Sequence, residues 1–254
     1  MRKSIVFAIF LTVVLGLCSA VRAQTLNADL LSRMAEQFSF FEVLDDKGDG
    51  IVRVMYADAR EHVHVYKLDK GKAELEWEAT TLGSRASGLF LADLEGDGTR
   101  EIVIATAGGR ILIYDATSYD LRWENLQDPF ESIESMVAAN IDGDPQAELI
   151  FIANSHLYIY DGLTKALEWQ SRDEFDAKQM VVENVDDDEQ LELITNTGVV
   201  FDTRFYNIEF ESEIRFGERI SLFDINGDGI PEVFGETPDF TLRIFDIYAE
   251  RELW

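Results

Sequence analysis

Asp224-Ile225-Asn226-Gly227-Asp228-Gly229-Ile230-Pro231-Glu232 carries a pattern of oxygen-bearing side chains from which the fold of this chain can be inferred. Short oxygen-bearing side chains stand at its positions 1, 3 and 5, a glycine follows at position 6, and a carboxylate ends it at position 9. This spacing lets a tight loop direct several oxygens at one centre, as a hard cation such as calcium requires. The glycine permits a positive φ angle at the sharpest bend.

The same nine-residue frame recurs along the chain. Copies begin at residues 93, 140 and 184, and a degenerate copy begins at residue 45, so that successive starts lie 48, 47, 44 and 40 residues apart. A second marker, an aromatic residue that closely follows a leucine or isoleucine, keeps the same step. Its members are Trp77, Trp123, Trp169, Phe210 and Trp254. Two markers with one period of about 40–50 residues are typical of propeller blades.

Each unit contains four short apolar runs bounded by turn formers. The unit around residue 93, for example, has runs at 88–92, 102–105 and 111–115 before the one that carries Trp123. The runs are β-branched or aromatic and four to six residues long, which favours strands over helices. We therefore predict an all-β propeller of about five four-stranded blades. The predicted blades span residues 38–82, 83–130, 131–174, 175–214 and 215–254, and either close as a ring of five or form part of a larger ring.

The loop frame, Asp-x-Asx-x-Asp-Gly-x-x-Glu followed by apolar residues, resembles the FG-GAP/VCBS repeats of β-propellers, of which the integrin-α-like propellers are the best known. The Tyr-Asp turns and the following Leu-x-Trp resemble the quinoprotein-like (PQQ-type) propeller repeat. The likeness covers residues 38–254. It implies that the loop joins the first two strands of a blade, and that the side chains at positions 1, 3, 5 and 9 and the carbonyl at position 7 bind calcium.

Carried onto this sequence, the resemblance implies up to four structural calcium ions. The implied ligands are Asp93, Glu95, Asp97, Thr99 and Glu101; Asn140, Asp142, Asp144, Gln146 and Glu148; Asn184, Asp186, Asp188, Gln190 and Glu192; and Asp224, Asn226, Asp228, Ile230 and Glu232. Position 6 is Pro145 in one loop and Glu189 in another. Proline cannot reach positive φ, and glutamate would be strained there, so calcium in these two loops stays open. The alternative for every copy is a simple turn.

The first copy, residues 45–53, departs furthest from the frame. Lys47 replaces the acid at position 3 and Arg53 replaces the closing glutamate. Either cation would repel calcium, and both could pair with Asp45 and Asp49. We expect this loop to keep its shape without a metal ion.

The chain starts like an exported protein. Arg2 and Lys3 precede the apolar run Ile5–Leu17, and small residues stand before Gln24, as in a secretory signal peptide. The alternative, a membrane anchor, needs about 20 apolar residues. We predict a signal peptide at 1–23, a leader at 24–37 that has helical spacing, and a periplasmic or extracellular location. Cleavage would remove Cys18, the only cysteine, and leave neither a disulfide nor a thiolate nucleophile.

The composition excludes some partners. The chain carries 22 basic and 49 acidic residues, and loss of the three basic residues of the signal would change its net charge from −27 to −30. Such a field opposes binding to nucleic acid, while 46% apolar residues argue against disorder. No later apolar run is long enough to span a membrane.

Few residues outside the loops suggest chemistry. His62 and His64 alternate, which could build a zinc pair, but the third histidine, His156, lies two units away and a solvated strand face is the preferred interpretation. The aromatic series is interpreted as packing between blades rather than as a sugar-binding platform.

We therefore expect a non-enzymatic scaffold that binds a protein or glycan. The alternatives are a hydrolase or lyase acting on polysaccharide and a quinone-dependent oxidoreductase. Ligand identity and oligomeric state are not indicated.

Overall fold

The computed structural model describes residues 40–44, 47–58, 60–126 and 130–254. This part folds into five four-stranded antiparallel sheets, in each of which the strands lie side by side in chain order. The strands are β1 Phe40–Leu44, β2 Val52–Ala57, β3 Val63–Asp69 and β4 Lys72–Ala79; β5 Ala86–Ala92, β6 Glu101–Thr106, β7 Ile111–Asp115 and β8 Leu121–Glu124; β9 Ile133–Ala139, β10 Glu148–Ala153, β11 His156–Tyr160 and β12 Leu167–Gln170; β13 Met180–Glu183, β14 Glu192–Thr195, β15 Val199–Asp202 and β16 Asn207–Glu211; β17 Arg219–Phe223, β18 Glu232–Glu236, β19 Leu242–Asp246 and β20 Arg251–Glu252.

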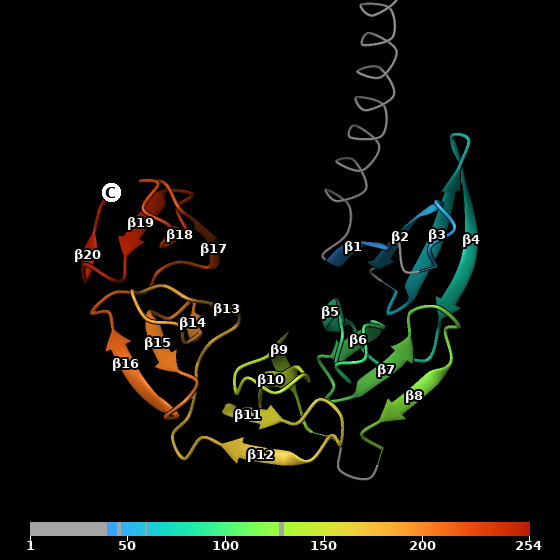
Figure 1. Cartoon of the computed structure of the whole chain (residues 1–254), viewed down its shortest axis with the longest axis horizontal. Helices are drawn as coiled ribbons and strands as arrows, with labels where there is room; N and C mark the ends of the chain where they lie inside the picture. Colours follow the sequence, from blue (N-terminus) through green and yellow to red (C-terminus); the bar gives the residue numbers. More distant parts are fainter. Residues whose placement is uncertain (1–39, 45–46, 59, 127–129) are drawn as a thin grey trace, which may run out of the picture.

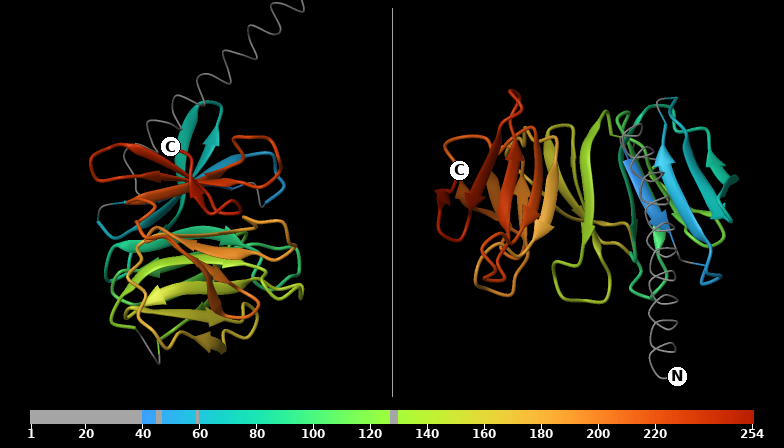
Figure 2. Two further views of the ribbon diagram at one scale, coloured as in Figure 1. Left: turned by 90° about the vertical axis from the view of Figure 1, so that its left-hand side faces the viewer. Right: turned by 90° about the horizontal axis from the view of Figure 1, so that it is seen from above.

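The sheets follow one another along an arc, like the blades of a propeller (Figure 1). The first strands of successive sheets, β1, β5, β9, β13 and β17, are neighbours and lie innermost, while β4, β8, β12 and β16 lie on the rim. Successive sheets face one another when seen from above (Figure 2), and the first and fifth sheets stand apart in Figure 1. The all-β fold of five four-stranded blades is thus confirmed.

The apolar cores lie between the blades. Strands β6 and β10 are buried along their whole length, because the two faces of each sheet pack against different neighbours. This explains why their sequences are continuous apolar runs rather than alternating ones. The largest side chain in the core between the second and third blades is Phe151, which is fully buried.

The aromatic series packs between blades. The Trp77 ring on β4 stacks on Tyr119 of the next blade with centroids 5.4 Å apart, and Trp169 on β12 stacks on Tyr206 at 5.2 Å. Tyr119 and Tyr206 occupy the same place in their blades, in the turn before the fourth strand, and both have positive φ. For these two positions the predicted packing role is confirmed.

Two predictions fall outside the described residues, namely the signal peptide at 1–23 and the leader at 24–37. Within the part of the chain that the structure describes, there is no helix with the length and apolar character needed to cross a bilayer.

Candidate metal loops and axial pocket

Each recurring frame forms the connection between the first and second strands of its blade, as the resemblance implied. Its closing glutamate is the first residue of the second strand, and the glutamate is no more than 5% exposed in the four full copies. In every copy its Oε2 accepts a hydrogen bond from the backbone amide at position 2, with lengths of 2.8–3.0 Å. The pairs are Leu94 with Glu101, Ile141 with Glu148, Val185 with Glu192 and Ile225 with Glu232.

Burial makes two of these carboxylates costly to ionise. It raises the pKa of Glu148 to about 7, and the nearby charge of Asp142 adds to the effect. Burial likewise raises the pKa of Glu192 to about 7, with a contribution from Asp186, and it raises the pKa of Glu101 to a smaller extent. A cation beside such a carboxylate would favour its charged form.

The acid at position 5 shapes the second half of each loop. Its Oδ1 accepts a hydrogen bond of 2.6–2.9 Å from the amide at position 7, which is the residue whose carbonyl the resemblance implies as a ligand. The donors are Thr99, Gln146, Gln190 and Ile230. In the loop at Asp224 the second oxygen of this acid, Oδ2 of Asp228, also accepts a hydrogen bond of 2.8 Å from Nδ2 of Asn226.

The loops are of two kinds, which differ at positions 1 and 6. In the loops that start at Asp93 and Asp224, Gly98 and Gly229 have positive φ, and their amides donate to the first aspartate at 2.8 and 2.9 Å. In the loops at Asn140 and Asn184, the first side chain instead donates from Nδ2 to the carbonyl of the aspartate at position 5.

Position 6 behaves as predicted in one of these loops and not in the other. The expectation that Pro145 forces a different bend is confirmed, since position 6 of this loop lacks the positive φ that Gly98 and Gly229 have. At position 4, Gly143 has a positive φ, as the glycines at that position of the other two loops do. The expected strain at Glu189 is wrong, because this residue does not have a positive φ. The loop at Asn184 therefore turns without a left-handed residue at position 6 and carries no strain there.

Carboxylates converge in the loops of the third and fourth blades. Oxygens of Asp142, Asp144 and Glu148 all lie within 4.8 Å of one another, and so do oxygens of Asp186, Glu192 and Glu209. Sets of carboxylate oxygens at this spacing suit a hard divalent cation, because calcium takes oxygen ligands at 2.3–2.6 Å. These two sets fit calcium because all their ligand atoms are carboxylate oxygens and because these oxygens lie close together.

Glu209 was missed by the sequence analysis. It lies on β16, where it is the middle residue of the Ile-x-Phe marker, and the fourth strand brings it beside the loop of its own blade. Burial and the charge of Asp186 raise its pKa. The equivalent residue of the third blade is Glu168, whose pKa is raised by burial and by acids that include Asp142. The repeated marker was therefore a usable signal, because its middle residue faces the loop.

The other two loops have polar partners of their own. Lys165, from the third blade, lies near enough to Glu95 and Glu101 for their charges to raise its pKa, although burial lowers it overall. In the fifth blade, Nδ2 of Asn226 donates to Asp228 at 2.8 Å and to Glu232 at 2.7 Å. An amide thus lies between two of the carboxylates in the loop at Asp224.

The loop of the first blade uses protein cations. Arg53 is 3% exposed, and its guanidinium contacts both oxygens of Asp49 at 2.9 and 2.7 Å and Oε2 of Glu76 at 2.8 Å. Lys47 contacts Oε1 of Glu76 at 2.5 Å, so among the described residues it pairs with Glu76 rather than with Asp49 as predicted. The predicted pairings with Asp45 lie outside the described residues. Glu76 holds the same place on β4 as Glu209 on β16, so the fourth-strand acid faces the loop here as well.

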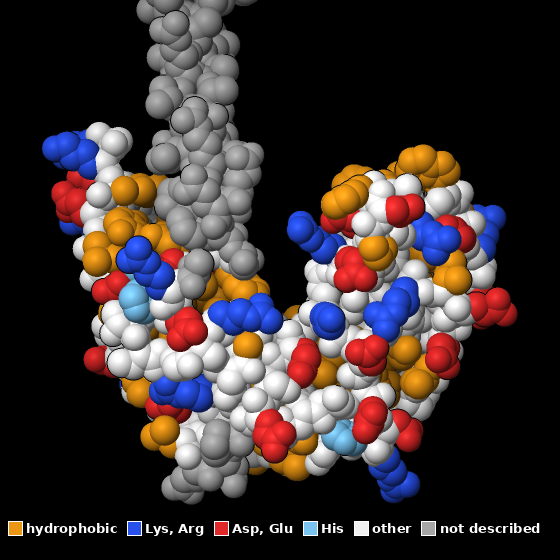
Figure 3. All heavy atoms as spheres, turned by 180° about the vertical axis from the view of Figure 1, so that it is seen from behind, with side chains coloured by type: hydrophobic (Ala, Val, Ile, Leu, Met, Phe, Trp, Pro, Cys, Tyr) orange, Lys and Arg blue, Asp and Glu red, His pale blue; other side chains and the backbone are white. Residues whose placement is uncertain are grey.

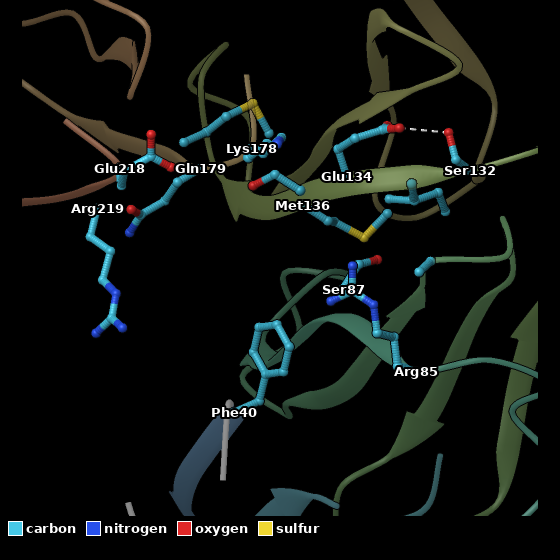
Figure 4. A pocket seen from close by; sticks show the side chains of 14 residues that line it. Phe40, Arg85, Ser87, Ser132, Glu134, Met136, Lys178, Gln179, Glu218 and Arg219 are labelled. Atoms are coloured by element: carbon cyan, nitrogen blue, oxygen red, sulfur yellow. Dashed lines mark hydrogen bonds between the residues drawn. The ribbon is translucent and has the colours of Figure 1, made fainter. Parts of the chain in front are cut away.

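A pocket of about 740 Å³ lies on the inner side of the arc, lined by the starts of the innermost strands of all five blades (Figure 4). Its charged residues have mixed sign. They are Arg85, Glu134, Lys178, Glu218 and Arg219. Glu134 accepts a 2.6 Å hydrogen bond from Ser132, and it lies on a different blade from Glu218. Lys and Arg side chains are visible around the hollow between the arms of the arc (Figure 3), in contrast to the acidic chain as a whole.

The fold has known relatives in structure. No protein-family model and no curated protein matches the sequence. Among solved structures, BBS1N in complex with ARL6DN superposes with a TM-score of 0.61 and 14% identity, over 84% of this chain and 66% of that one. The V. cholerae biofilm matrix protein Bap1 gives 0.59 and 19%, over 85% of this chain and 39% of that one. The chain thus spans about two thirds and two fifths of these proteins, and at such identities the likeness concerns the fold alone.

Proposed function

We propose that this chain is an exported, non-enzymatic binding scaffold whose blades are stabilised by structural calcium in the acidic loops. The observation that carries the calcium proposal is the convergence of carboxylates in the loops at Asn140 and Asn184, where a buried closing glutamate lies beside more exposed acids. The loop of the first blade gives a second argument for calcium. There Lys47 and Arg53 provide the positive charge that calcium would provide in the other loops.

Thermal unfolding with and without a chelator tests the calcium proposal. A calcium concentration 100 times the dissociation constant stabilises a folded protein by about 2.7 kcal/mol for each site. In a domain of this size that corresponds to a rise in Tm of about 5–10 °C per site. Magnesium serves as the control, since it demands a tighter octahedral geometry. An identical Tm in calcium and in chelator would contradict the proposal.

The scaffold proposal rests on the arc of five blades and on the pocket of mixed charge on its inner side. Of the two structural relatives, one was crystallised in complex with ARL6DN and the other is a biofilm matrix protein. We propose that this chain likewise binds a protein or a glycan, and that the blade-start residues around the pocket make the contact.

Crosslinking of the intact protein in its native extracellular or periplasmic fraction tests this, with a variant that reverses Lys178 and Arg219 beside the wild type. Both side chains are exposed, so the variant should fold normally. A specific crosslink that the variant loses supports the scaffold, whereas equal capture by both proteins contradicts the proposed surface. Export is checked in the same fraction by N-terminal sequencing, which should begin at Gln24.

The rival enzymatic function has less support. Cleavage of a glycosidic bond needs two carboxyl groups across one bond, about 5–10 Å apart. In the pocket, Glu134 and Glu218 point from opposite sides of the view, with a lysine and a glutamine between them (Figure 4). Turnover of polysaccharide by the wild type that disappears in Glu134→Gln would favour the enzyme.

A further inference from the structure

The turn between β2 and β3 brings together two histidines and two acids at the edge of the first blade opposite to its acidic loop. His62 and His64 are two residues apart, so their side chains share a face of the sheet. In the strand register, His64 pairs with Tyr56 on one side and with Glu78 on the other. Asp58 starts the turn, and its backbone amide donates to the carbonyl of His62 at 2.9 Å.

His64 is not on a solvated strand face, and the preferred sequence interpretation is wrong on this point. The residue is 8% exposed, and its ring lies against Tyr56 with centroids 5.0 Å apart. Its Nδ1 is buried and makes no hydrogen bond within the described part of the chain, although Oε1 of Glu78 lies 3.2 Å away. A buried imidazole nitrogen without a hydrogen bond needs a ligand or a proton partner.

The ligand atoms of three residues are already grouped. Nε2 of His64 lies 3.1 Å from Oδ2 of Asp58, and Nδ1 of His62 lies 3.8 Å from the same oxygen. One ligand atom from each of the three residues falls within 4.8 Å of the others. A tetrahedral zinc ion with bonds of about 2.0–2.2 Å separates its ligand atoms by little more than 3 Å. Small side-chain movements would therefore bring the three ligand atoms to the separation that zinc requires.

The turn fixes Asp58 for such a role. Its Oδ1 accepts hydrogen bonds from the amides of Arg60 at 2.7 Å and His62 at 3.0 Å, which leaves Oδ2 directed toward the histidines. Oε1 of Glu78 lies 3.2 Å from Nδ1 of His64, so it can accept the proton of this second ring nitrogen, and it lies 3.8 Å from Nδ1 of His62. At zinc sites, a metal-bound histidine usually donates the proton of its other ring nitrogen to a carboxylate, which fixes the orientation of the ring.

We propose that Asp58, His62 and His64 form a site for a borderline transition-metal ion of the zinc class, with Glu78 as a positioning residue. Imidazole ligands distinguish this site from the all-oxygen loops, because nitrogen favours zinc, copper or nickel over calcium. The site offers three protein ligands and therefore leaves a fourth position for water or for a donor from a partner. The side chain of His62 is 32% exposed, so the ion can enter from solvent.

Isothermal titration of the whole protein with zinc, in buffer containing excess calcium, tests the proposal. The wild type should bind one zinc ion, and His62→Asn together with His64→Asn should weaken its binding at least about 100-fold. His156→Asn is the matched control, because His156 lies on β11 of another blade and should not matter. Glu78→Gln should weaken binding about 10- to 100-fold, as loss of a carboxylate that orients a metal-bound histidine does.

Two further measurements keep the result unambiguous. Circular dichroism of each variant without metal checks folding, and His62→Asn alone provides a milder change because this residue is partly exposed. Cobalt(II) in place of zinc should give the visible spectrum of a four-coordinate site only when both histidines are present. Weak zinc binding that is equal in wild type and double variant would overturn the proposal, and would leave His64 as an ion-paired histidine between Asp58 and Glu78.

Discussion

The loop of the first blade and the loop of the fourth blade share one nine-residue frame but differ in charge. In the first, Arg53 and Lys47 reach Asp49 and Glu76. In the fourth, the corresponding residues are acids, and Asp186, Glu192 and Glu209 converge instead. The comparison teaches that the backbone of this corner forms with either arrangement, and that the charge at positions 3 and 9 decides whether positive charge is supplied by the protein or must come from solution.

The largest effect is expected from exchanging the two kinds of loop. Lys47→Asp together with Arg53→Glu would place acids beside Asp49 and Glu76 in the first blade. Breaking a buried ion pair typically costs about 3–5 kcal/mol, so the Tm measured in chelator should fall by roughly 10 °C. Calcium should restore much of this loss.

The control for this exchange is Lys47→Met together with Arg53→Met, which removes the same ion pairs without adding acids. Its Tm in chelator should be lower than that of the wild type, and calcium should raise its Tm no more than it raises the Tm of the wild type. Recovery of both variants to the same extent would show that the loop charge does not create a calcium site.

A smaller effect is expected at the third blade, where one substitution should raise or preserve stability in chelator and lower it in calcium. Glu148→Gln removes a buried carboxylate but keeps an oxygen that can accept the 2.8 Å hydrogen bond from Ile141. In chelator at pH 8 the variant should be as stable as the wild type or more stable by about 1 kcal/mol. The reason is that burial raises the pKa of Glu148 in the wild type to about 7, so its charge is unfavourable there. In calcium it should be less stable, by up to about 2.7 kcal/mol. Denaturant titration in both buffers measures the two differences.

The pH dependence of stability gives the next effect. The pKa values of Glu148 and Glu192 are raised by burial from 4.5 to about 7. The folded chain therefore holds more protons than the unfolded chain between these values, so its free energy of unfolding falls as pH rises from about 4.5 to 7 and levels off above. In chelator we expect a loss of up to about 3 kcal/mol for each glutamate across this window, since one pKa unit corresponds to about 1.4 kcal/mol. Calcium should reverse the slope near pH 7, and an unchanged profile in Glu148→Gln, Glu192→Gln would contradict the assignment.

The smallest effect concerns the loop at Asp93. Lys165→Met removes a cation whose charge acts on Glu95 and Glu101. Calcium affinity at this loop should rise by a few-fold, because the loop no longer has a protein cation near its acids. Titration at low and at high salt checks this, since the gain should shrink as salt screens the charge. Lys178→Met is the control for loss of a lysine elsewhere.

The fold was readable from the chain because its signals are local and repeated. The strand β7 coincides with the predicted run 111–115, since its β-branched and apolar residues, its Tyr-Asp ending and the flanking turns lie within a few residues. The closing glutamates were also correctly placed as part of the loops, because position 9 of the frame falls at the start of a strand. Whether these loops bind calcium stays a prediction.

Residue spacing over fewer than 50 positions was enough to define the repeating unit, with its four strands, its acidic corner and an aromatic that packs on the next blade. Which charged side chains meet depends on the folded arrangement of the blades. Lys47 contacts Glu76, which is 29 residues away in the sequence. Glu209 on the rim strand lies beside the loop of its own blade, and His64 is buried between Asp58 and Glu78. These contacts depend on strand register and on the stacking of neighbouring sheets, and neither is recorded in the spacing of residues along the chain.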